Sequence, residues 1–227
     1  MSDEAPVEPT SRRDIAVARS LDPARARAEK RVQRFLDAAL ELMLNSTGKE
    51  FTVQEVVERS GQSLRSFYQY FAGKYELLLA LFEESVRTTA VQLAEKIEGE
   101  KDPLERFHIA AVEYYRICQP NPKAKTAKKG RAPALAEFAQ QLLTEHPREA
   151  SHAFVPIVDL FEELLDDAAA AGQIRKGLDH RRISGVILES VMFNAFAATI
   201  GGTSVREDGA GEELWELILH GIATPGS

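Results

Sequence analysis

FTVQEVVERSGQSLRSFYQYFAGKYELLLALF, residues 51–82, is the stretch of the sequence that decides the fold. Thr52 followed by Glu55 is a capping box, which predicts that a helix begins there and runs to about Ser60. Gly61 is the residue type that best adopts the left-handed conformation after a helix end. Ser63 can then cap a second short helix. Two short helices joined by a three-residue turn with glycine are the helix-turn-helix pattern, whose second helix enters a DNA major groove.

The outward face of this second helix has side chains that form hydrogen bonds and contains no carboxylate. Its residues are Gln62, Ser63, Arg65, Ser66, Gln69 and Tyr70. A face that is merely solvated usually mixes Glu and Lys, whereas a face without acids suits phosphates and base edges. The alternative is an ordinary helical hairpin within an all-helical core. Lys74 lies at the start of the next helix, where exposed backbone N–H groups favour a phosphate.

Residues 61–77 resemble the signature of the TetR (tetracycline-repressor-like) family, G-V-S-x-x-T-L-Y-x-H-F-x-x-K-x-x-L. The direct matches are Gly61, Ser63, Tyr68, Phe71, Lys74 and Leu77. Three positions hold substitutes: Ser66 for Thr, Phe67 for Leu and Tyr70 for His. The resemblance implies that Tyr68 and Lys74 contact phosphates, and that the outward residues before and around Tyr68 contact bases.

Two residues depart from that signature. Gln62 replaces an apolar residue, and Leu64 stands where a polar base-reading residue is common. Either Leu64 meets a thymine methyl group, or it turns inward and Gln62 reads the bases. The complete expected DNA-binding set is Thr52, Gln62, Ser63, Leu64, Arg65, Ser66, Tyr68, Gln69, Tyr70 and Lys74.

The net charge of −7 conceals a basic region. Residues 11–75 hold 12 Lys and Arg against 8 Asp and Glu, whereas residues 76–227 hold 16 against 24. The region expected to contact DNA is therefore the positive one, and the local field matters more than the total charge.

We expect three parts: a disordered basic arm at 1–21, a three-helix DNA-binding domain at 22–73, and a larger helical ligand-binding and dimerisation domain at 74–227. The arm carries Arg12, Arg13 and Arg19, and it either contacts DNA or is a solvated tail. Asp22-Pro23 predicts a helix start, with a cap followed by proline. That helix should end at Asn45.

The fold class is all-α, with about nine helices. Beyond the first three helices, we expect helices at 74–97, 102–118, 135–142, 147–171 and 179–200, and a last one containing Leu214 and Leu219. Pro156 should bend or interrupt the helix at 147–171, the fourth of these six. The basic segment 119–133 is either a surface loop or a patch for an anionic group, such as a coenzyme A phosphate, or for DNA.

The helix at 179–200 is apolar nearly all round its axis, so it must be covered on every side. A single chain can scarcely supply that cover. We therefore expect a homodimer in which this helix and the last one form a four-helix interface. The expected contributors from the last helix are Leu214, Trp215, Ile218 and Leu219.

A small molecule should bind among the aromatic side chains of the C-terminal domain, which favour an apolar or amphipathic ligand. His108 and Asn194 are the polar candidates. The complete set is Phe107, His108, Tyr114, Tyr115, Phe138, Phe154, Phe161, Met192, Phe193, Asn194 and Phe196. The TetR resemblance implies that this ligand tilts the helix at 74–97 and changes the spacing of the two DNA-reading helices.

Other classes of function find little support. None of the five histidines has a recognised metal-ligand spacing, so we expect no catalysis, metal or cofactor. No apolar run could span a membrane, and the single cysteine, Cys118, agrees with a reducing cytoplasm. A purely helical dimeric scaffold, or a small-molecule-binding protein without DNA binding, is the alternative. The sequence favours a homodimeric transcriptional regulator, a repressor of a near-palindromic operator released by its ligand.

Overall fold

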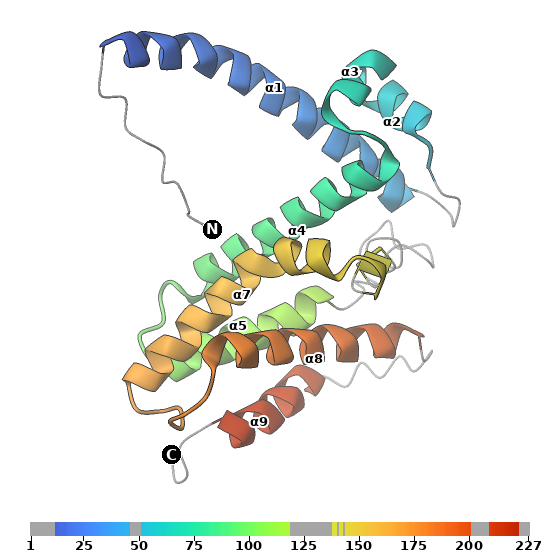
Figure 1. Cartoon of the computed structure of the whole chain (residues 1–227). Helices are drawn as coiled ribbons and strands as arrows, with labels where there is room; N and C mark the ends of the chain where they lie inside the picture. Colours follow the sequence, from blue (N-terminus) through green and yellow to red (C-terminus); the bar gives the residue numbers. More distant parts are fainter. Residues whose placement is uncertain are drawn as a thin grey trace. The chain divides into compact units, whose positions relative to one another are not determined.

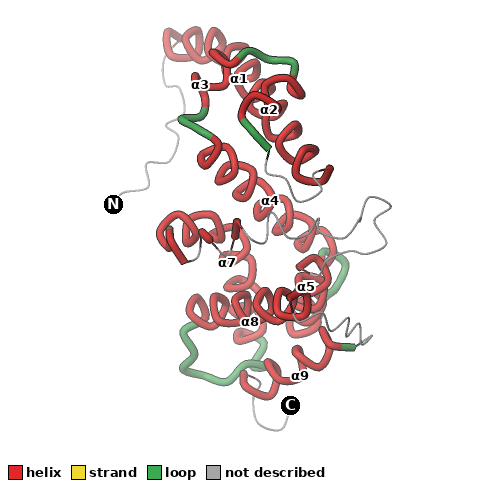
Figure 2. Tube along the Cα trace, turned by 90° about the vertical axis from the view of Figure 1, so that its right-hand side faces the viewer, coloured by secondary structure: helices red, strands yellow, loops and turns green. Residues whose placement is uncertain are grey.

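The computed structural model describes the backbone of residues 12–45, 51–118, 138–139, 141–142, 144–200 and 209–222, and their side chains except at 12–21, 44–45 and 195–200. The described part is helical and contains no strand (Figures 1 and 2). Its helices are α1 (Arg12–Asn45), α2 (Val53–Ser60), α3 (Leu64–Tyr70), α4 (Lys74–Ile97), α5 (Pro103–Cys118), α7 (Pro147–Ala170), α8 (His180–Ile200) and α9 (Ala210–Ile222). The expected all-α class is confirmed. The basic segment 119–133 lies outside the described residues.

The chain forms two compact units. The first contains residues 1–42 and 50–77, and the second contains 43–49 and 78–227. Helix α4 begins in the first unit and continues into the second. The first unit packs around Phe35 of α1, which is fully buried against the edges of the Phe67 and Phe71 rings. Such aromatic contacts hold α1 against the second short helix.

Helix α1 begins ten residues before the expected start at Asp22. It runs from Arg12 and contains Pro23 in its interior. The expectation that residues 12–21 belong to a disordered arm was therefore wrong. Alanine, arginine and leucine in this segment favour a helix strongly enough to continue it past one proline, even though proline removes a backbone donor.

In the second unit, α5 is the central helix, since it contacts α7, α8 and α9 (Figure 1). Phe107 of α5 is fully buried between the rings of Phe161 and Trp215, at centroid distances of 5.7 and 5.2 Å. Helix α4 contributes Phe82, whose ring meets Phe138 and Phe154 edge-on. The aromatic residues predicted in this half therefore form much of its core.

Local signals position the helix starts in this unit. The Asp102 carboxylate accepts a hydrogen bond from the Glu105 N–H at 2.9 Å, and Asp179 accepts one from the Arg182 N–H at 3.0 Å. Both carboxylates therefore cap the starts of their helices. Pro156, by contrast, does not interrupt α7. Buried Ala153 and Ile157 on either side keep this face of the helix packed, which stabilises it across the missing donor.

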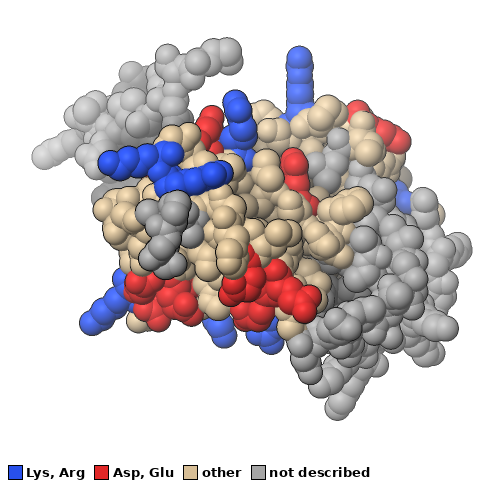
Figure 3. All heavy atoms as spheres, turned by 90° about the horizontal axis from the view of Figure 1, so that it is seen from below, with Lys and Arg blue, Asp and Glu red and all other residues tan. Residues whose placement is uncertain are grey.

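Helices α8 and α9 expose large apolar side chains. Phe193 is 69% exposed and Leu217 is 73% exposed, and Val186 is also exposed. Trp215, which we expected at a dimer interface, instead packs inside the chain against α5. The view from below shows uncharged surface over much of the described part, with two larger groups of acidic side chains and further acidic and basic side chains elsewhere (Figure 3).

Candidate nucleic-acid interface

The first short helix begins with the capping box that its sequence predicts. The Thr52 hydroxyl accepts a hydrogen bond from the Glu55 N–H at 3.2 Å, and the Thr52 N–H donates to the Glu55 carboxylate at 2.7 Å. The hydroxyl also donates to this carboxylate at 2.9 Å. Thr52 is exposed, and its polar groups hold the helix end in place.

Gly61 ends α2 and turns the chain towards α3. Its φ is 64°, in the left-handed region that favours glycine. The Gly61 N–H donates to the Glu58 carbonyl at 3.3 Å, and the Gln62 N–H donates to the Val57 carbonyl at 3.2 Å. These bonds satisfy carbonyls at the end of α2 and fix the direction in which the chain leaves it.

The second short helix divides into an inward and an outward face. The Ser63 hydroxyl caps it by accepting from the Ser66 N–H at 3.1 Å. Phe67 points into the core, whereas Leu64, Arg65, Tyr68 and Gln69 are exposed. Ser66 and Tyr70 are half-buried at the edges. Of the expected hydrogen-bonding side chains, Arg65 and Gln69 thus lie on the exposed side of α3.

Gln62 and Leu64 have different environments in the structure. Leu64 is 43% exposed, so it does not turn inward. The Gln62 amide is half-buried, and its Nε2 donates to the backbone carbonyl of Arg31 in α1 at 2.8 Å. Of the two arrangements left open by the sequence, the one with Leu64 on the outside fits this structure.

Tyr68 and Lys74 are the two residues expected to contact phosphates. Tyr68 is 57% exposed, and its ring stands edge-on to Phe67. The Lys74 ammonium lies 4.8 Å from the centroid of the Phe51 ring, a cation–π contact. At the start of α4, the Glu76 carboxylate accepts from the Ala72 N–H, so an acidic side chain already caps this helix end.

Helix α1 adds exposed cations that the expected DNA-binding set omitted. They are Arg25, Arg27, Lys30, Arg31 and Arg34. Arg25 is paired with Glu29 at 2.8 Å, which leaves its charge partly compensated. The run of basic residues in the sequence was the signal that could have added them, because clustered cations on one helix favour a polyanion.

The expected ligand-binding residues of the second unit do not all come together. Phe107, Tyr114 and Phe161 are buried and in mutual ring contact through Phe161. Tyr115, Phe138 and Phe154 also belong to this core, and Met192 is half-buried. Phe193 and Asn194 are exposed instead. The side chain of Phe196 lies outside the described residues.

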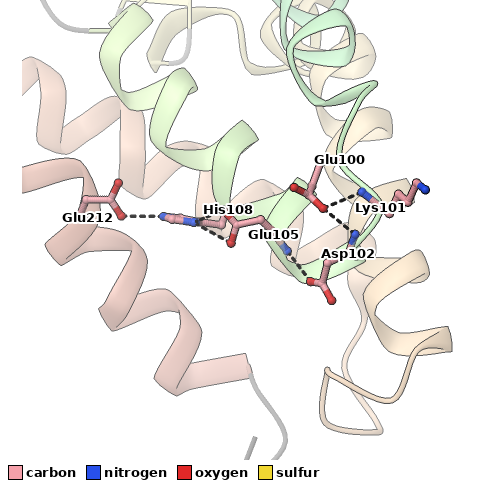
Figure 4. A network of polar contacts seen from close by, with 6 residues as sticks. All are labelled: Glu100, Lys101, Asp102, Glu105, His108 and Glu212. Atoms are coloured by element: carbon pink, nitrogen blue, oxygen red, sulfur yellow. Dashed lines mark hydrogen bonds and ion pairs between the residues drawn. The ribbon is translucent and has the colours of Figure 1, made fainter.

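His108 bridges two helices instead of pointing into an apolar core. Its Nε2 lies 2.6 Å from the Glu212 carboxylate of α9, and its Nδ1 lies 3.2 Å from Glu105 of α5 (Figure 4). Its ring stacks on Trp215 at 5.0 Å. Burial lowers the pKa of His108, but the hydrogen bonds that its ring donates to the Glu212 and Glu105 carboxylates outweigh burial, so the pKa is raised above its ordinary value of 6.5.

Among the described residues, no group of three or more His, Cys, Asp or Glu could hold a metal ion. No helix in that part of the chain is long and apolar enough to cross a membrane.

A capped helix, a left-handed glycine turn and a second short helix with an exposed polar face define a helix-turn-helix DNA-binding protein. Residues 35–81 match the family model for bacterial regulatory proteins of the tetR family. This part of the chain therefore matches the DNA-binding domain of the TetR family, as the signature in residues 61–77 implied.

Several known proteins resemble the whole chain. A fatty acid metabolism regulator protein of Bacillus subtilis is 20% identical over 189 residues, which cover 83% of this chain and 94% of the relative. The crystal structure of FadR from B. subtilis with stearoyl-CoA superposes with a TM-score of 0.64 at 17% identity, covering 84% of this chain and 98% of FadR. SmeT, a repressor of a Stenotrophomonas maltophilia efflux pump, superposes with a TM-score of 0.61 at 17% identity, covering 86% and 91%. These similarities establish a common fold.

Proposed function

We propose that the chain is a homodimeric repressor, released from a near-palindromic operator by a small apolar or amphipathic molecule. The observation that carries the proposal is the outward face of α3, where Leu64, Arg65 and Tyr68 are exposed and no carboxylate intervenes. Base edges and phosphates are the partners that such a face suits. The residues that contact DNA are those predicted from the sequence except Thr52 and Gln62, which act by holding the helices in place.

The homodimer is supported by the apolar surface of α8 and α9. Phe193 and Leu217 are more than two-thirds exposed, although large apolar side chains are usually covered. A two-fold partner that covers them also explains how two recognition helices reach successive half-sites. Their spacing is expected to be one helical turn, roughly 34 Å, or a multiple of it.

The effector class is supported by the aromatic core of the second unit and by one relative. Phe107, Tyr114 and Phe161 offer apolar surface without charge, which suits an acyl chain or a polycyclic compound. FadR of B. subtilis, which shares the fold, was crystallised with stearoyl-CoA. A ligand that binds the DNA-released state more tightly shifts the population towards it. This mechanism requires no catalysis, and it places the protein in the cytoplasm with the DNA.

The test has two steps, on an operator recovered from genomic fragments. A reporter placed behind the operator should fall in expression when the protein is present, as expected of a repressor. The purified complex is then titrated with fatty acids and acyl-CoAs of graded chain length, with coenzyme A alone as the control. Release that depends on chain length supports an acyl effector. Release by coenzyme A alone contradicts the apolar ligand, and increased reporter expression contradicts repression.

A further inference from the structure

Gln62 has an environment unlike that of the other polar residues at the expected DNA surface. It lies in the turn between α2 and α3, directly before the cap residue Ser63. Its backbone N–H bonds to the end of α2, at the Val57 carbonyl. Its side chain reaches 31 residues back along the sequence to α1, where Nε2 donates to the Arg31 carbonyl at 2.8 Å. One residue therefore connects all three helices of the domain.

The other contacts between these helices constrain the rotation of α3 on α1 only weakly. The ion pair between Arg59 of α2 and Glu41 of α1 is about half exposed at both side chains, and pairs of this kind contribute little. Phe35 fixes the depth at which α3 packs on α1, but ring edges resist sliding and rotation weakly. A directed hydrogen bond at the first residue of the turn constrains rotation, because it fixes a donor and an acceptor along one line.

This hydrogen bond also makes the Gln62 amide unavailable for reading a base. A glutamine that specifies adenine uses its amide oxygen and its amide nitrogen together on the base edge. Here the nitrogen is directed into the protein, and the Ser66 hydroxyl lies 3.5 Å from the amide oxygen. Leu64, two residues further along the chain, faces outward instead.

We propose that Gln62 is a positioning residue, which sets the orientation of α3 on α1 and so aims the outward residues at the bases. This inference rests on the proposed reading of DNA by α3. Replacing Gln62 then misaligns every base-reading side chain of α3 together. It leaves contacts to phosphates unchanged, because those do not depend on a base register.

The experiment compares Gln62→Ala and Gln62→Asn with the native protein. Asn keeps an amide but is one methylene shorter, so it does not reach the Arg31 carbonyl. For each variant, affinity is measured for the operator, for every single-base-pair substitution in it, and for unrelated DNA, together with the thermal midpoint. Gln54→Ala is the matched control, because Gln54 is an exposed glutamine of α2 that bonds only within its own helix, to Glu58. Gln69→Ala provides a comparison on the outward face of α3.

The proposal predicts that both Gln62 variants lose about five- to tenfold of operator affinity, the worth of one hydrogen bond. The loss should flatten the base preference evenly at all read positions, while affinity for unrelated DNA stays as in the native protein and the thermal midpoint falls by only about 2–4 °C, as the loss of one hydrogen bond implies. A loss confined to one base pair shows that Gln62 reads a base and overturns the proposal. Equal losses on all DNA with a lower thermal midpoint, or no loss at all, overturn it as well.

A second measurement keeps the inference separate from the proposed function. Backbone amide exchange in the free protein should become faster in α3 relative to α2 when Gln62 is replaced, and remain unchanged in the Gln54 control. If the native protein selects no DNA sequence, the proposed reading of DNA fails. The exchange comparison still decides whether Gln62 holds α3 on α1. Equal exchange rates in the native and Gln62→Ala proteins would show that it does not.

Discussion

For Lys74 and Arg65, two side chains of the proposed DNA surface, we expect different contacts, to phosphates and to bases. Lys74 lies where α4 begins, with its ammonium over the Phe51 ring. Arg65 is exposed on the first turn of α3. A lysine near a helix start acts on phosphates as a point charge, whereas arginine on a recognition helix can form two parallel hydrogen bonds with guanine.

Replacing Lys74 by alanine should weaken binding to every DNA sequence by a similar factor. The slope of log affinity against log salt should fall by about one unit, because one phosphate contact is lost. A salt titration on the operator and on unrelated DNA measures this. Lys176→Ala, an exposed lysine of the second unit, is the control and should leave the slope unchanged. A base-specific effect of Lys74→Ala would contradict its assignment to the backbone.

Arg65→Ala should instead cost about 1–3 kcal/mol at particular base pairs and relax the preference there. Affinity measured on a set of operators with single substitutions reveals which positions change. If the loss has equal size on every DNA, Arg65 belongs with the phosphate-contacting residues.

At this scale the sequence predicted what depends on neighbours within one helical turn. The caps at Thr52 and Ser63 are confirmed because each needs only a suitable side chain and an N–H three residues on. The partner of Gln62 lies 31 residues away. No local pattern indicates such a contact, so the sequence left the roles of Gln62 and Leu64 open.

Among the elements, the turn after α2 depends on a single glycine. Gly61 has a φ of 64°, and nothing lies within 4 Å of a methyl group added there. Gly61→Ala should therefore lower the free energy of unfolding by about 1 kcal/mol through backbone conformation alone. Chemical denaturation measures the change, and Gly61→Asn should lose less because asparagine tolerates this region better. Equal stability of the alanine variant and the native protein would contradict the turn geometry.

The contact between α5 and α9 should depend on pH through His108. Both ring nitrogens face carboxylates, Glu105 and Glu212, so the protonated ring can donate to both while the neutral ring cannot. The pKa of His108 is raised, so its contribution to stability is complete below the ordinary value of 6.5 and is lost as pH rises through the higher pKa of the folded state.

The measurement is the stability difference between the native protein and His108→Gln at several pH values. It should be largest near pH 6 and shrink as the pH rises beyond the pKa of His108 in the folded state. His152, an exposed histidine of α7, offers the control variant His152→Gln. A difference that grows with pH would show that His108 is neutral in the folded protein.

Element ends were predicted well at Thr52 and Ser63, where a cap forms, and poorly where the prediction relied on a proline. Helix α1 passes through Pro23, and α7 passes through Pro156. Proline removes one hydrogen bond, which helix-favouring neighbours or a packed face can outweigh. The prediction that Trp215 lies at a dimer interface was wrong. The sequence shows that α9 is apolar, but it does not show which side of α9 packs against α5.

On the scale of the whole molecule, the exposed apolar side chains of α8 and α9 call for a partner. Phe193→Glu combined with Leu217→Glu should convert the proposed dimer into a monomer, because charges at such an interface lose their hydration on association. Sedimentation measures the mass. Val91→Glu changes an exposed apolar residue of α4 and should leave the dimer intact. A native protein that is monomeric at all concentrations would contradict the interface.

The central claim is that two copies of this chain read a near-palindromic operator through α3. The most direct test is a selection of genomic fragments by the purified protein, followed by a salt titration and a stoichiometry on the fragment recovered. We predict a near-palindromic site that binds two subunits, with affinity that falls steeply as salt rises. Enrichment of no sequence, with no binding even at low salt, would contradict the account and favour a helical protein that binds small molecules without DNA.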